Sequence, residues 1–169
     1  KPFLDAVEDG ETFEENAISK ISELVADYKN ILLVSDKNTY GVCGEAVKAQ
    51  LGDRCYDSVV FVCEGFLVPN EESVAEVQKH LADNTDLIVG IGSGVIQDLC
   101  KYTAFESKLP YFVVATAPSM DGYASTGAAM IMGGMKVTYS AEIPEAIIAE
   151  PEVLANAPIE MIKAGYGDI

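Results

Sequence analysis

The residues best suited to chemistry in this sequence are three closely spaced glycines, Gly90, Gly92 and Gly94, which follow the apolar run from Asp86 to Val89. Glycine has no Cβ, so the main chain can turn sharply there and bring its N–H groups close to an anion. A helix is expected from about Val95, and its amino-terminal end would add a positive dipole. The pattern predicts a turn that binds phosphate groups, such as those of a nucleotide diphosphate.

This turn matches neither of the two common phosphate-binding fingerprints. A dinucleotide-binding G-x-G-x-x-G sequence would have glycine in place of Val95, and a P-loop would continue with Gly-Lys and then Ser or Thr. A tight connection between a strand and a helix, with no ligand, is therefore the alternative interpretation.

The elements that must position the turn follow a regular alternation of helices and apolar strands. Helices are predicted at Glu14–Tyr28, Thr39–Leu51, Asn70–Ala82 and Val95–Glu106, and strands at Ile31–Val34, Ser58–Cys63, Asp86–Val89 and Tyr111–Ala115. Short, continuously apolar strands separated by helices indicate a doubly wound α/β fold with a mostly parallel, Rossmann-like sheet.

Ligands of such sheets bind at the carboxyl ends of the strands. Four loops are expected to share that rim, and they are Ser35-Asp36, Cys63-Glu64-Gly65, the glycine turn, and the segment from Thr116 to Gly122. Their convergence favours a binding site over an empty turn.

The pattern changes after Ser125. Ala129–Met132 and Met135–Tyr139 predict an added β-hairpin whose Gly133-Gly134 turn needs positive φ angles. A strand is then expected at Ala146–Ala149, followed by short helices at Pro151–Ala155 and Pro158–Ala164, each opened by its proline.

The sequence stops soon after an apolar helix leads into the glycine-flanked Asp168. We therefore expect an amino-terminal portion of a longer protein. Residues 1–157 are expected to form a nucleotide-binding α/β domain, and residues 158–169 to begin a helical metal-binding domain that is otherwise absent from the chain.

Composition narrows the possible partners. The formal net charge of −16, from 27 acidic and 11 basic residues, would repel nucleic acid and anionic membranes, so a phosphorylated ligand has to be held by local donors. No apolar run is long enough for membrane insertion, and the first ten residues lack the features of a signal peptide. A cytoplasmic protein is expected.

The cysteines and the single histidine do not indicate a metal site. Cys43, Cys55, Cys63 and Cys100 form no C-x-x-C pair, and all except Cys55 are in apolar or helical contexts typical of reduced core thiols. His80 lies on a polar helix face, which indicates a surface residue, because one imidazole without partners makes no site.

Three segments together resemble the sn-glycerol-1-phosphate dehydrogenases, a branch of the superfamily of dehydroquinate synthase and iron-containing alcohol dehydrogenase. The similarity extends over nearly the whole chain from about Leu32. Its specific parts are Gly92-Ser-Gly-Val-Ile-Gln-Asp98 with Lys101-Tyr102, Thr116-Ala-Pro-Ser-Met-Asp-Gly-Tyr-Ala-Ser125, and Ala149-Glu-Pro-Glu-Val-Leu-Ala-Asn-Ala-Pro158 with Ala164-Gly-Tyr-Gly-Asp168.

The resemblance implies that the chain binds NAD or NADP. Its pyrophosphate and adjoining ribose would contact Gly94, Val95, Ile96, Gln97 and Asp98, its nicotinamide half would contact Thr116, Ala117, Pro118, Ser119 and Ser125, and Asp36 would lie near the adenosine ribose. Gln97 stands where the family commonly has asparagine and Val95 where it often has threonine, and both departures leave the phosphate turn intact. An acidic Asp36 leans toward NAD, because it would repel the 2′-phosphate of NADP.

The resemblance also implies two catalytic residues, Asp121 at the substrate and Asp168 as the first ligand of a divalent metal, zinc or nickel. Two histidines from a following helical domain would complete the protein ligands. From the residues alone, Asp168 reads as a helix-end capping acid, Asp121 as an Asx-turn residue, and Thr116 and Ser119 as ordinary caps.

The leading hypothesis is an oxidoreductase that interconverts dihydroxyacetone phosphate and sn-glycerol 1-phosphate, a homo-oligomer at full length. This chain alone should be inactive. The alternatives are a glycerol or other polyol dehydrogenase of the same superfamily, and a noncatalytic nucleotide-binding module. A serine or cysteine hydrolase is a poor hypothesis, because one histidine cannot serve a nucleophilic relay without partners.

Overall fold

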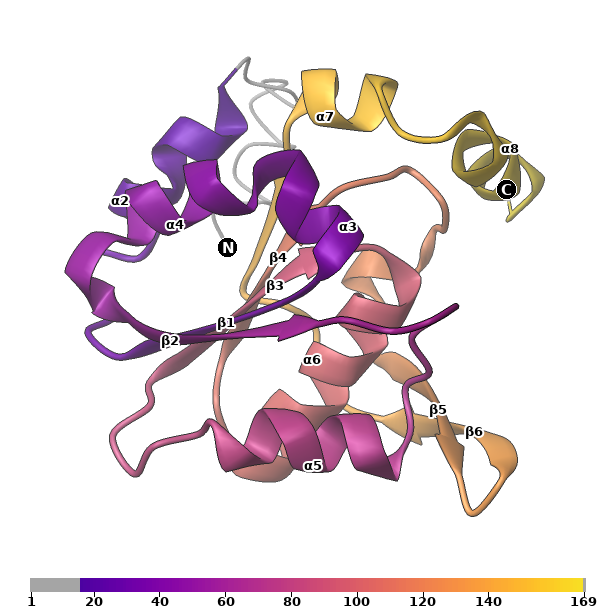
Figure 1. Cartoon of the computed structure of the whole chain (residues 1–169), viewed down its shortest axis with the longest axis horizontal. Coiled ribbons are helices and arrows are strands. Elements are labelled where there is room, and N and C mark those ends of the chain that lie inside the picture. The colour runs from indigo at the N-terminus through magenta and orange to yellow at the C-terminus, as the bar shows by residue number, and fades with distance from the viewer. Residues whose placement is uncertain (1–15, 169) are drawn as a thin grey trace.

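Five parallel strands form the central sheet of the computed structural model, which describes residues 16–168 (Figure 1). The strands lie in the order β2-β1-β3-β4-β7. Their bounds are Ile31–Asp36 for β1, Cys55–Phe61 for β2, Leu87–Gly92 for β3, Tyr111–Ala115 for β4 and Ala146–Ala149 for β7. The predicted doubly wound α/β fold is confirmed. Only the bounds differ, as in β2, which starts before the predicted Ser58.

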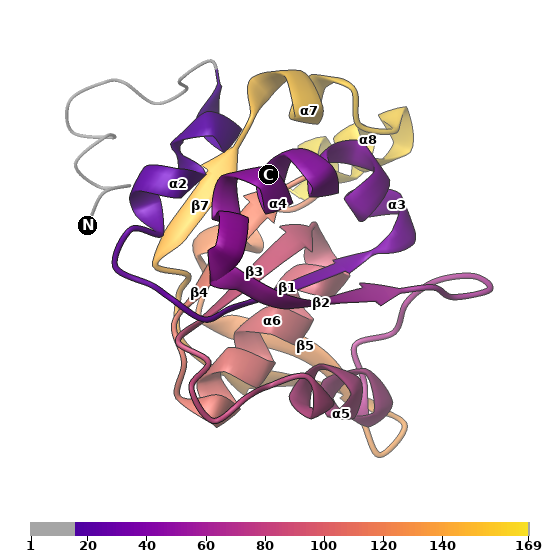
Figure 2. The same ribbon diagram turned by 60° about the vertical axis from the view of Figure 1, so that its left-hand side comes forward.

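Helices cover both faces of this sheet, as Figures 1 and 2 show from two directions. On one side lie α2 (Ile21–Leu24) and α4 (Glu45–Leu51), and on the other lie α5 (Glu71–Lys79), α6 (Gly94–Ser107) and the hairpin of β5 (Gly127–Met132) and β6 (Met135–Ser140). The remaining elements are η1 (Ala17–Lys20), α3 (Lys37–Thr39), η2 (Tyr40–Gly44), η3 (Gly52–Arg54), η4 (Gly122–Ala124), α7 (Pro151–Ala155) and α8 (Ile159–Asp168).

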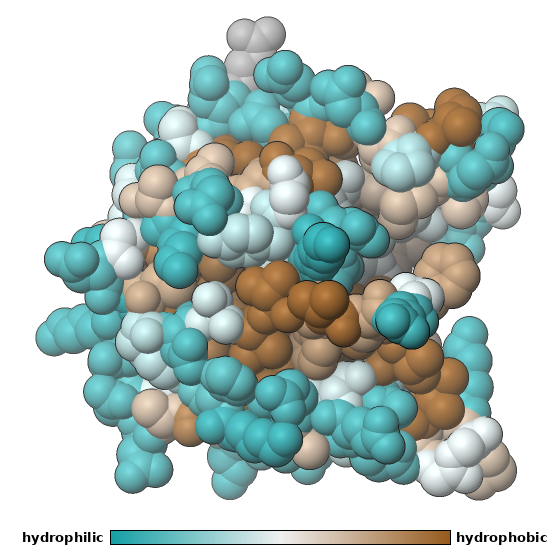
Figure 3. Space-filling model, viewed as in Figure 1, coloured by the Kyte–Doolittle hydropathy of each residue, from teal (hydrophilic) through white to brown (hydrophobic). Residues whose placement is uncertain are grey.

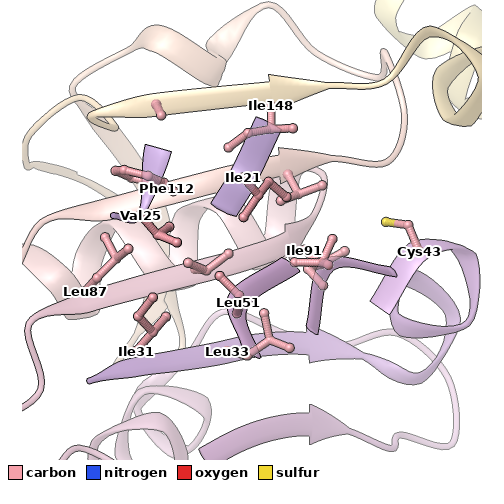
Figure 4. Packing of buried hydrophobic residues seen from close by; sticks show 14 residues of the cluster. Ile21, Val25, Ile31, Leu33, Cys43, Leu51, Leu87, Ile91, Phe112 and Ile148 are labelled. Carbon is pink, nitrogen blue, oxygen red and sulfur yellow. The ribbon is translucent and has the colours of Figure 1, made fainter. Parts of the chain in front are cut away.

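The core has two layers, because successive side chains of β1, β3 and β4 point to opposite faces of the sheet and both faces are covered. Figure 4 shows the layer under α2 and α4, where Ile31 and Leu33 of β1 meet Ile91 of β3 and Ile21 of α2. The opposite layer packs Leu32, Val34 and Ile88 against α5 and α6. Complete burial of one such side chain stabilises the fold by about 1.5–3 kcal/mol.

The side to which the chain crosses over changes between the neighbouring strands β1 and β3. After β1 the chain crosses to β2 on one side, whereas after β3 it crosses to β4 on the other. The loops that leave these two neighbouring strands therefore run in opposite directions and leave a crevice at their carboxyl ends, where ligands of doubly wound sheets bind. Asp36 and the glycine turn both lie at that point.

The first predicted helix, Glu14–Tyr28, is wrong in extent. Its first two residues lie outside the described residues, and the rest is a short 3₁₀ turn followed by the four residues of α2. The chain must turn back after α2 to enter β1, and the Asp86 carboxylate holds that turn by accepting the N–H groups of Lys29 and Asn30 at 2.8 and 3.0 Å.

The second half matches its prediction more closely. The Gly133-Gly134 turn of the hairpin has φ angles of 59° and 76°, as expected for a tight turn that needs glycine. Pro151 opens α7 as predicted. Helix α8 continues beyond the predicted Ala164, through Gly165 and Gly167 to Asp168.

The cysteines differ from the prediction at one position. Cys43 and Cys100 are buried free thiols, but Cys63 is exposed, because β2 ends at Phe61 before reaching it. Burial raises the pKa of Cys43 to about 11 and that of Cys100 to about 12, so both remain protonated thiols at neutral pH. None of the helices within residues 16–168 has the length and apolar character that a bilayer crossing needs.

His80 lies at the end of α5, partly exposed, as predicted for a surface residue. Its Nδ1 is 2.7 Å from Asp57 Oδ2 and its Nε2 is 3.6 Å from Glu76 Oε1. The hydrogen bond with Asp57 raises the pKa of His80 above its usual value. The charged pair therefore stabilises the folded state most fully below pH of about 6.5, and this contribution disappears as the pH rises through the raised pKa.

We expect His80→Gln to lower the free energy of unfolding by about 0.2–1 kcal/mol at pH 5.5, the range for exposed ion pairs. The difference from the unsubstituted protein should vanish near pH 9, because His80 is then neutral in both states. Urea unfolding of both proteins at the two pH values measures this difference in the free energy of unfolding. An equal difference at both values would mean that the effect is packing and not charge.

Candidate functional site

The glycine turn is where β3 ends and α6 begins, and its glycines have different roles. A Cβ on Gly90 would lie 2.7 Å from the Cys100 sulfur, and a Cβ on Gly92 would lie 2.6 Å from Ile96 Cβ. These two glycines therefore allow α6 to pack closely on β3, a role that the sequence analysis did not predict. At Gly94 a Cβ would meet only the Met120 sulfur at 3.8 Å, so the main chain there is open to a ligand.

The first turn of α6 supplies backbone donors at this opening. The first backbone hydrogen bond of the helix runs from Gln97 N–H to Ser93 O at 2.9 Å, and the Ser93 side chain forms no capping bond. The N–H groups of Gly94, Val95 and Ile96 precede that bond and have no acceptor within the helix. Together with the dipole of a helix of 14 residues, they can bind an anion.

Asp36 ends β1 at the other side of the crevice and caps α3. Its Oδ1 accepts the N–H groups of Asn38 and Thr39 at 2.8 and 2.9 Å, and the Thr39 hydroxyl accepts the Asp36 N–H at 3.1 Å. Both capping bonds use Oδ1. The cap therefore does not need the second carboxylate oxygen, which can still accept a hydrogen bond from a sugar hydroxyl.

The loop after β4 is attached to the same rim. Thr116 N–H donates to Gly92 O at 3.3 Å, which joins the ends of β4 and β3. Thr116 and Ala117 are buried, Pro118 is exposed and Ser119 is half-buried. Of these four residues, which are predicted to contact the nicotinamide half, Pro118 and Ser119 therefore present the most surface.

Asp121 and Asp168 are brought together across 47 positions of sequence, because Asp121 N–H donates to Asp168 Oδ2 at 3.2 Å. Their approach depends on Gly165, where a Cβ would lie only 1.8 Å from the Pro118 carbonyl oxygen. The two glycines that precede Asp168 therefore differ, because a Cβ on Gly167 would meet nothing within 4 Å.

Three of the other predicted cofactor residues point into the protein. Ile96 is part of the core under α6, and Gln97 is fully buried, with its Nε2 donating to Tyr123 O at 2.9 Å and to Tyr111 Oη at 3.4 Å. Asp98 is half-buried and accepts a hydrogen bond from the backbone of Ala129, and burial raises its pKa. Ile96 and Gln97 can reach a cofactor only through their backbone.

Lys101 and Tyr123, to which the sequence analysis assigned no role, hold the loop from Ala117 to Gly127 in place. Lys101 donates to Ser125 Oγ at 3.1 Å and to Gly127 O at 3.0 Å, while Tyr123 Oη donates to Ala117 O at 2.7 Å. Ser125, predicted as a cofactor residue, is exposed and is one of the acceptors of Lys101. The sequence did offer one signal: the Gln97 amide and the Lys101 amine lie one turn apart on a largely apolar helix.

The donor set for a metal is incomplete within the part of the chain that the structure describes. It contains no group of three His, Cys, Asp or Glu residues placed to hold a metal ion. Asp168 is exposed and offers one carboxylate, whose Oδ2 also accepts the Asp121 N–H. One hard oxygen ligand of this kind fits a divalent metal whose other ligands come from elsewhere.

A cavity of about 550 Å³ lies away from this rim, between the end of α6 and the starts of β4 and β7. Its lining includes Lys108, Tyr111, Glu142 and Glu145. It is at the amino ends of the strands, the edge opposite to the one where doubly wound sheets bind ligands. The candidate site is therefore the open rim and not this cavity.

Comparison with known proteins assigns the family. The family model described as iron-containing alcohol dehydrogenase matches residues 12–158, most of the chain. The chain belongs to this family. It is 32% identical to the glycerol-1-phosphate dehydrogenase [NAD(P)+] of Geobacillus stearothermophilus, over 84% of this chain and 36% of that protein. It is 33% identical to the enzyme of the same name from Methanococcoides burtonii, over 90% of this chain and 43% of that protein.

Two solved structures that superpose on this chain have the same fold. The glycerol dehydrogenase of Schizosaccharomyces pombe superposes with a TM-score of 0.77 and 22% identity, over 91% of this chain and 40% of that one. A 2-deoxy-scyllo-inosose synthase, solved with carbaglucose-6-phosphate, NAD+ and Co2+, superposes with a TM-score of 0.76 and 17% identity, over 91% of this chain and 46% of that one. The chain thus spans less than half the length of these relatives.

Proposed function

We propose that this chain is the cofactor-binding part of an NAD(P)-dependent, metal-dependent oxidoreductase that interconverts dihydroxyacetone phosphate and sn-glycerol 1-phosphate. The observation that carries the proposal is the shared rim: the open start of α6 at Gly94 and the Asp121–Asp168 pair both lie at carboxyl ends of the sheet. The relatives at 32–33% identity, which are glycerol-1-phosphate dehydrogenases by name, support the substrate.

The cofactor would lie along the rim from β1 to β4. The N–H groups at the start of α6 would bind the pyrophosphate, Asp36 would accept from the adenosine ribose, and the backbone and hydroxyls of residues 116–119 with Ser125 would hold the nicotinamide half. The two phosphates need local donors, because the chain carries a net charge of −16. A helix amino terminus provides such donors without a basic side chain.

Asp168 would be the ligand that this chain contributes to a divalent metal, zinc or nickel, with two histidines from outside the chain. When bound, such a metal acts as a Lewis acid that stabilises negative charge developing on the carbonyl oxygen of the ketone. Asp121 would orient a substrate hydroxyl beside it. Through its backbone N–H, Asp121 also holds the Asp168 carboxylate in one orientation.

The full-length protein provides the test. With zinc or nickel supplied, we expect dihydroxyacetone phosphate to oxidise NADH or NADPH, and no oxidation with dihydroxyacetone. Turnover of glycerol in preference to sn-glycerol 1-phosphate would replace this proposal with the polyol dehydrogenase, which the S. pombe structural neighbour favours. Calorimetry that shows NAD binding without any metal or turnover would favour a noncatalytic nucleotide-binding module.

Asp36 should determine the coenzyme preference. We expect Asp36→Asn to raise the kcat/KM ratio of NADPH over NADH by about tenfold, because it removes a charge that repels the 2′-phosphate. Asparagine caps helices as well as aspartate does, so the melting temperature should not change. Asp36→Ala also loses the cap and should cost about 1 kcal/mol of stability. An unchanged preference in both variants would show that the ribose lies elsewhere.

The remaining parts of the proposal concern the whole protein. Residues 158–169 would begin a helical metal-binding domain, and the protein would be cytoplasmic and homo-oligomeric. Apolar surface on the face shown in Figure 3, across the position of the edge strand β2, supports association between copies. Val62 and Phe66, which follow β2, are 75% and 97% exposed. Light scattering of the full-length protein would measure its oligomeric state.

A further inference from the structure

Lys101 is a charged residue in a place where the fold does not need one. It is 1% exposed in the middle of α6, and its ammonium donates to Gly122 O at 3.5 Å as well as to Ser125 Oγ and Gly127 O. All three acceptors are neutral oxygens, and burial lowers the pKa of Lys101, although the nearby Asp98 carboxylate opposes this change. A buried cation without a paired anion costs free energy that a methionine of similar length would not.

The three acceptors belong to one segment, residues 122–127, which begins immediately after Asp121 and contains Ser125. Gln97, one turn earlier on α6, donates to Tyr123 O in the same segment, and Tyr123 Oη donates in turn to Ala117 O. Two buried polar side chains of α6 therefore attach the whole loop from residue 117 to residue 127. In Figure 1 this loop runs from β4 past α6 to β5.

The same helix carries the proposed pyrophosphate site at its first turn. A rigid attachment between α6 and the loop would therefore fix the distance between the coenzyme and Asp121. We propose that Lys101 is a positioning residue, which holds residues 122–127 so that Asp121 and Ser125 keep a fixed place relative to the coenzyme. This inference rests on the proposed function for its catalytic consequence, but not for the attachment itself.

Steady-state kinetics of full-length variants test the consequence. We expect Lys101→Met to lower kcat by about tenfold or more, because small displacements of a catalytic group are costly, while the dissociation constant of NADH changes by less than about threefold. Lys101→Arg keeps a donor at this position and should recover kcat to within about threefold of the unsubstituted protein. Lys79→Met, which removes an exposed lysine of α5, is the matched control and should leave both constants unchanged.

Hydrogen exchange of residues 122–127 tests the attachment independently of turnover. Exchange should become about tenfold faster or more in Lys101→Met and remain slow in Lys101→Arg and Lys79→Met. If the unsubstituted protein does not reduce dihydroxyacetone phosphate, the proposed function fails, and the exchange measurement still decides this inference. Exchange and kcat in Lys101→Met equal to those of Lys79→Met would overturn it. Should Lys101→Met not fold, Lys101→Leu removes the same donor with a shorter apolar side chain and gives the same comparison.

Discussion

Replacing Gly94 by aspartate is expected to weaken NAD(P) binding strongly while leaving the fold intact. Gly94 is the first residue of α6, and its surroundings leave room for a side chain, since a Cβ would meet only the Met120 sulfur at 3.8 Å. A carboxylate there would occupy the place proposed for the pyrophosphate and repel it. We expect the dissociation constant of NADH to rise by about 100-fold or more, which corresponds to about 2.7 kcal/mol.

The same substitution separates loss of binding from loss of stability. Acidic residues in the first turn of a helix stabilise it by about 0.3–1 kcal/mol, so the melting temperature of Gly94→Asp should stay level or rise. Gly94→Ala is the control, and its small neutral side chain should weaken binding by less than about tenfold. Calorimetric titration with NADH measures the dissociation constant of the unsubstituted protein and of both variants. Unchanged affinity in Gly94→Asp would show that the start of α6 does not bind the coenzyme.

Sequence periodicity predicted most of this fold, because its strands are buried on both faces. Continuous apolar runs such as Ile31–Val34 and Tyr111–Ala115 are fully buried in the sheet, and their hydrophobicity alone identified them. The prediction failed in the first helix, where the return into β1 depends on the Asp86 carboxylate, more than 50 positions away in sequence. A contact of that separation leaves no periodic signal.

The sequence predicted the parts of the candidate site that backbone groups form. It predicted less well the parts that depend on the direction of side chains. The opening at Gly94 follows directly from the glycine pattern. Gln97 was predicted to contact the cofactor, yet its amide is buried against Tyr123 and Tyr111, since residue type alone does not fix which face of α6 it occupies. The role of Lys101 depends on three oxygens of a loop whose path the sequence does not reveal.

Gly165→Ala should lower the rate of catalysis sharply by moving Asp168 away from Asp121. An alanine Cβ at this position would lie 1.8 Å from the Pro118 carbonyl oxygen, and backbone cannot yield as a flexible side chain does, so α8 must shift away from the loop. Displacement of a catalytic group by about 1 Å can cost about 100-fold in rate. We expect a loss of kcat of at least about that size in the full-length protein, with NADH affinity within about threefold, because Gly94 is on another element.

Gly167→Ala is a closely matched control, because it makes the same chemical change two positions along α8, where a Cβ meets nothing within 4 Å. Both substitutions gain the same helix propensity, about 1 kcal/mol, so the difference between them isolates the contact with Pro118. Stopped-flow reduction of dihydroxyacetone phosphate and bound metal per subunit should fall together in Gly165→Ala and remain normal in Gly167→Ala. Equal turnover in the two variants would mean that the approach of α8 to the loop is not what holds Asp168 in the active arrangement.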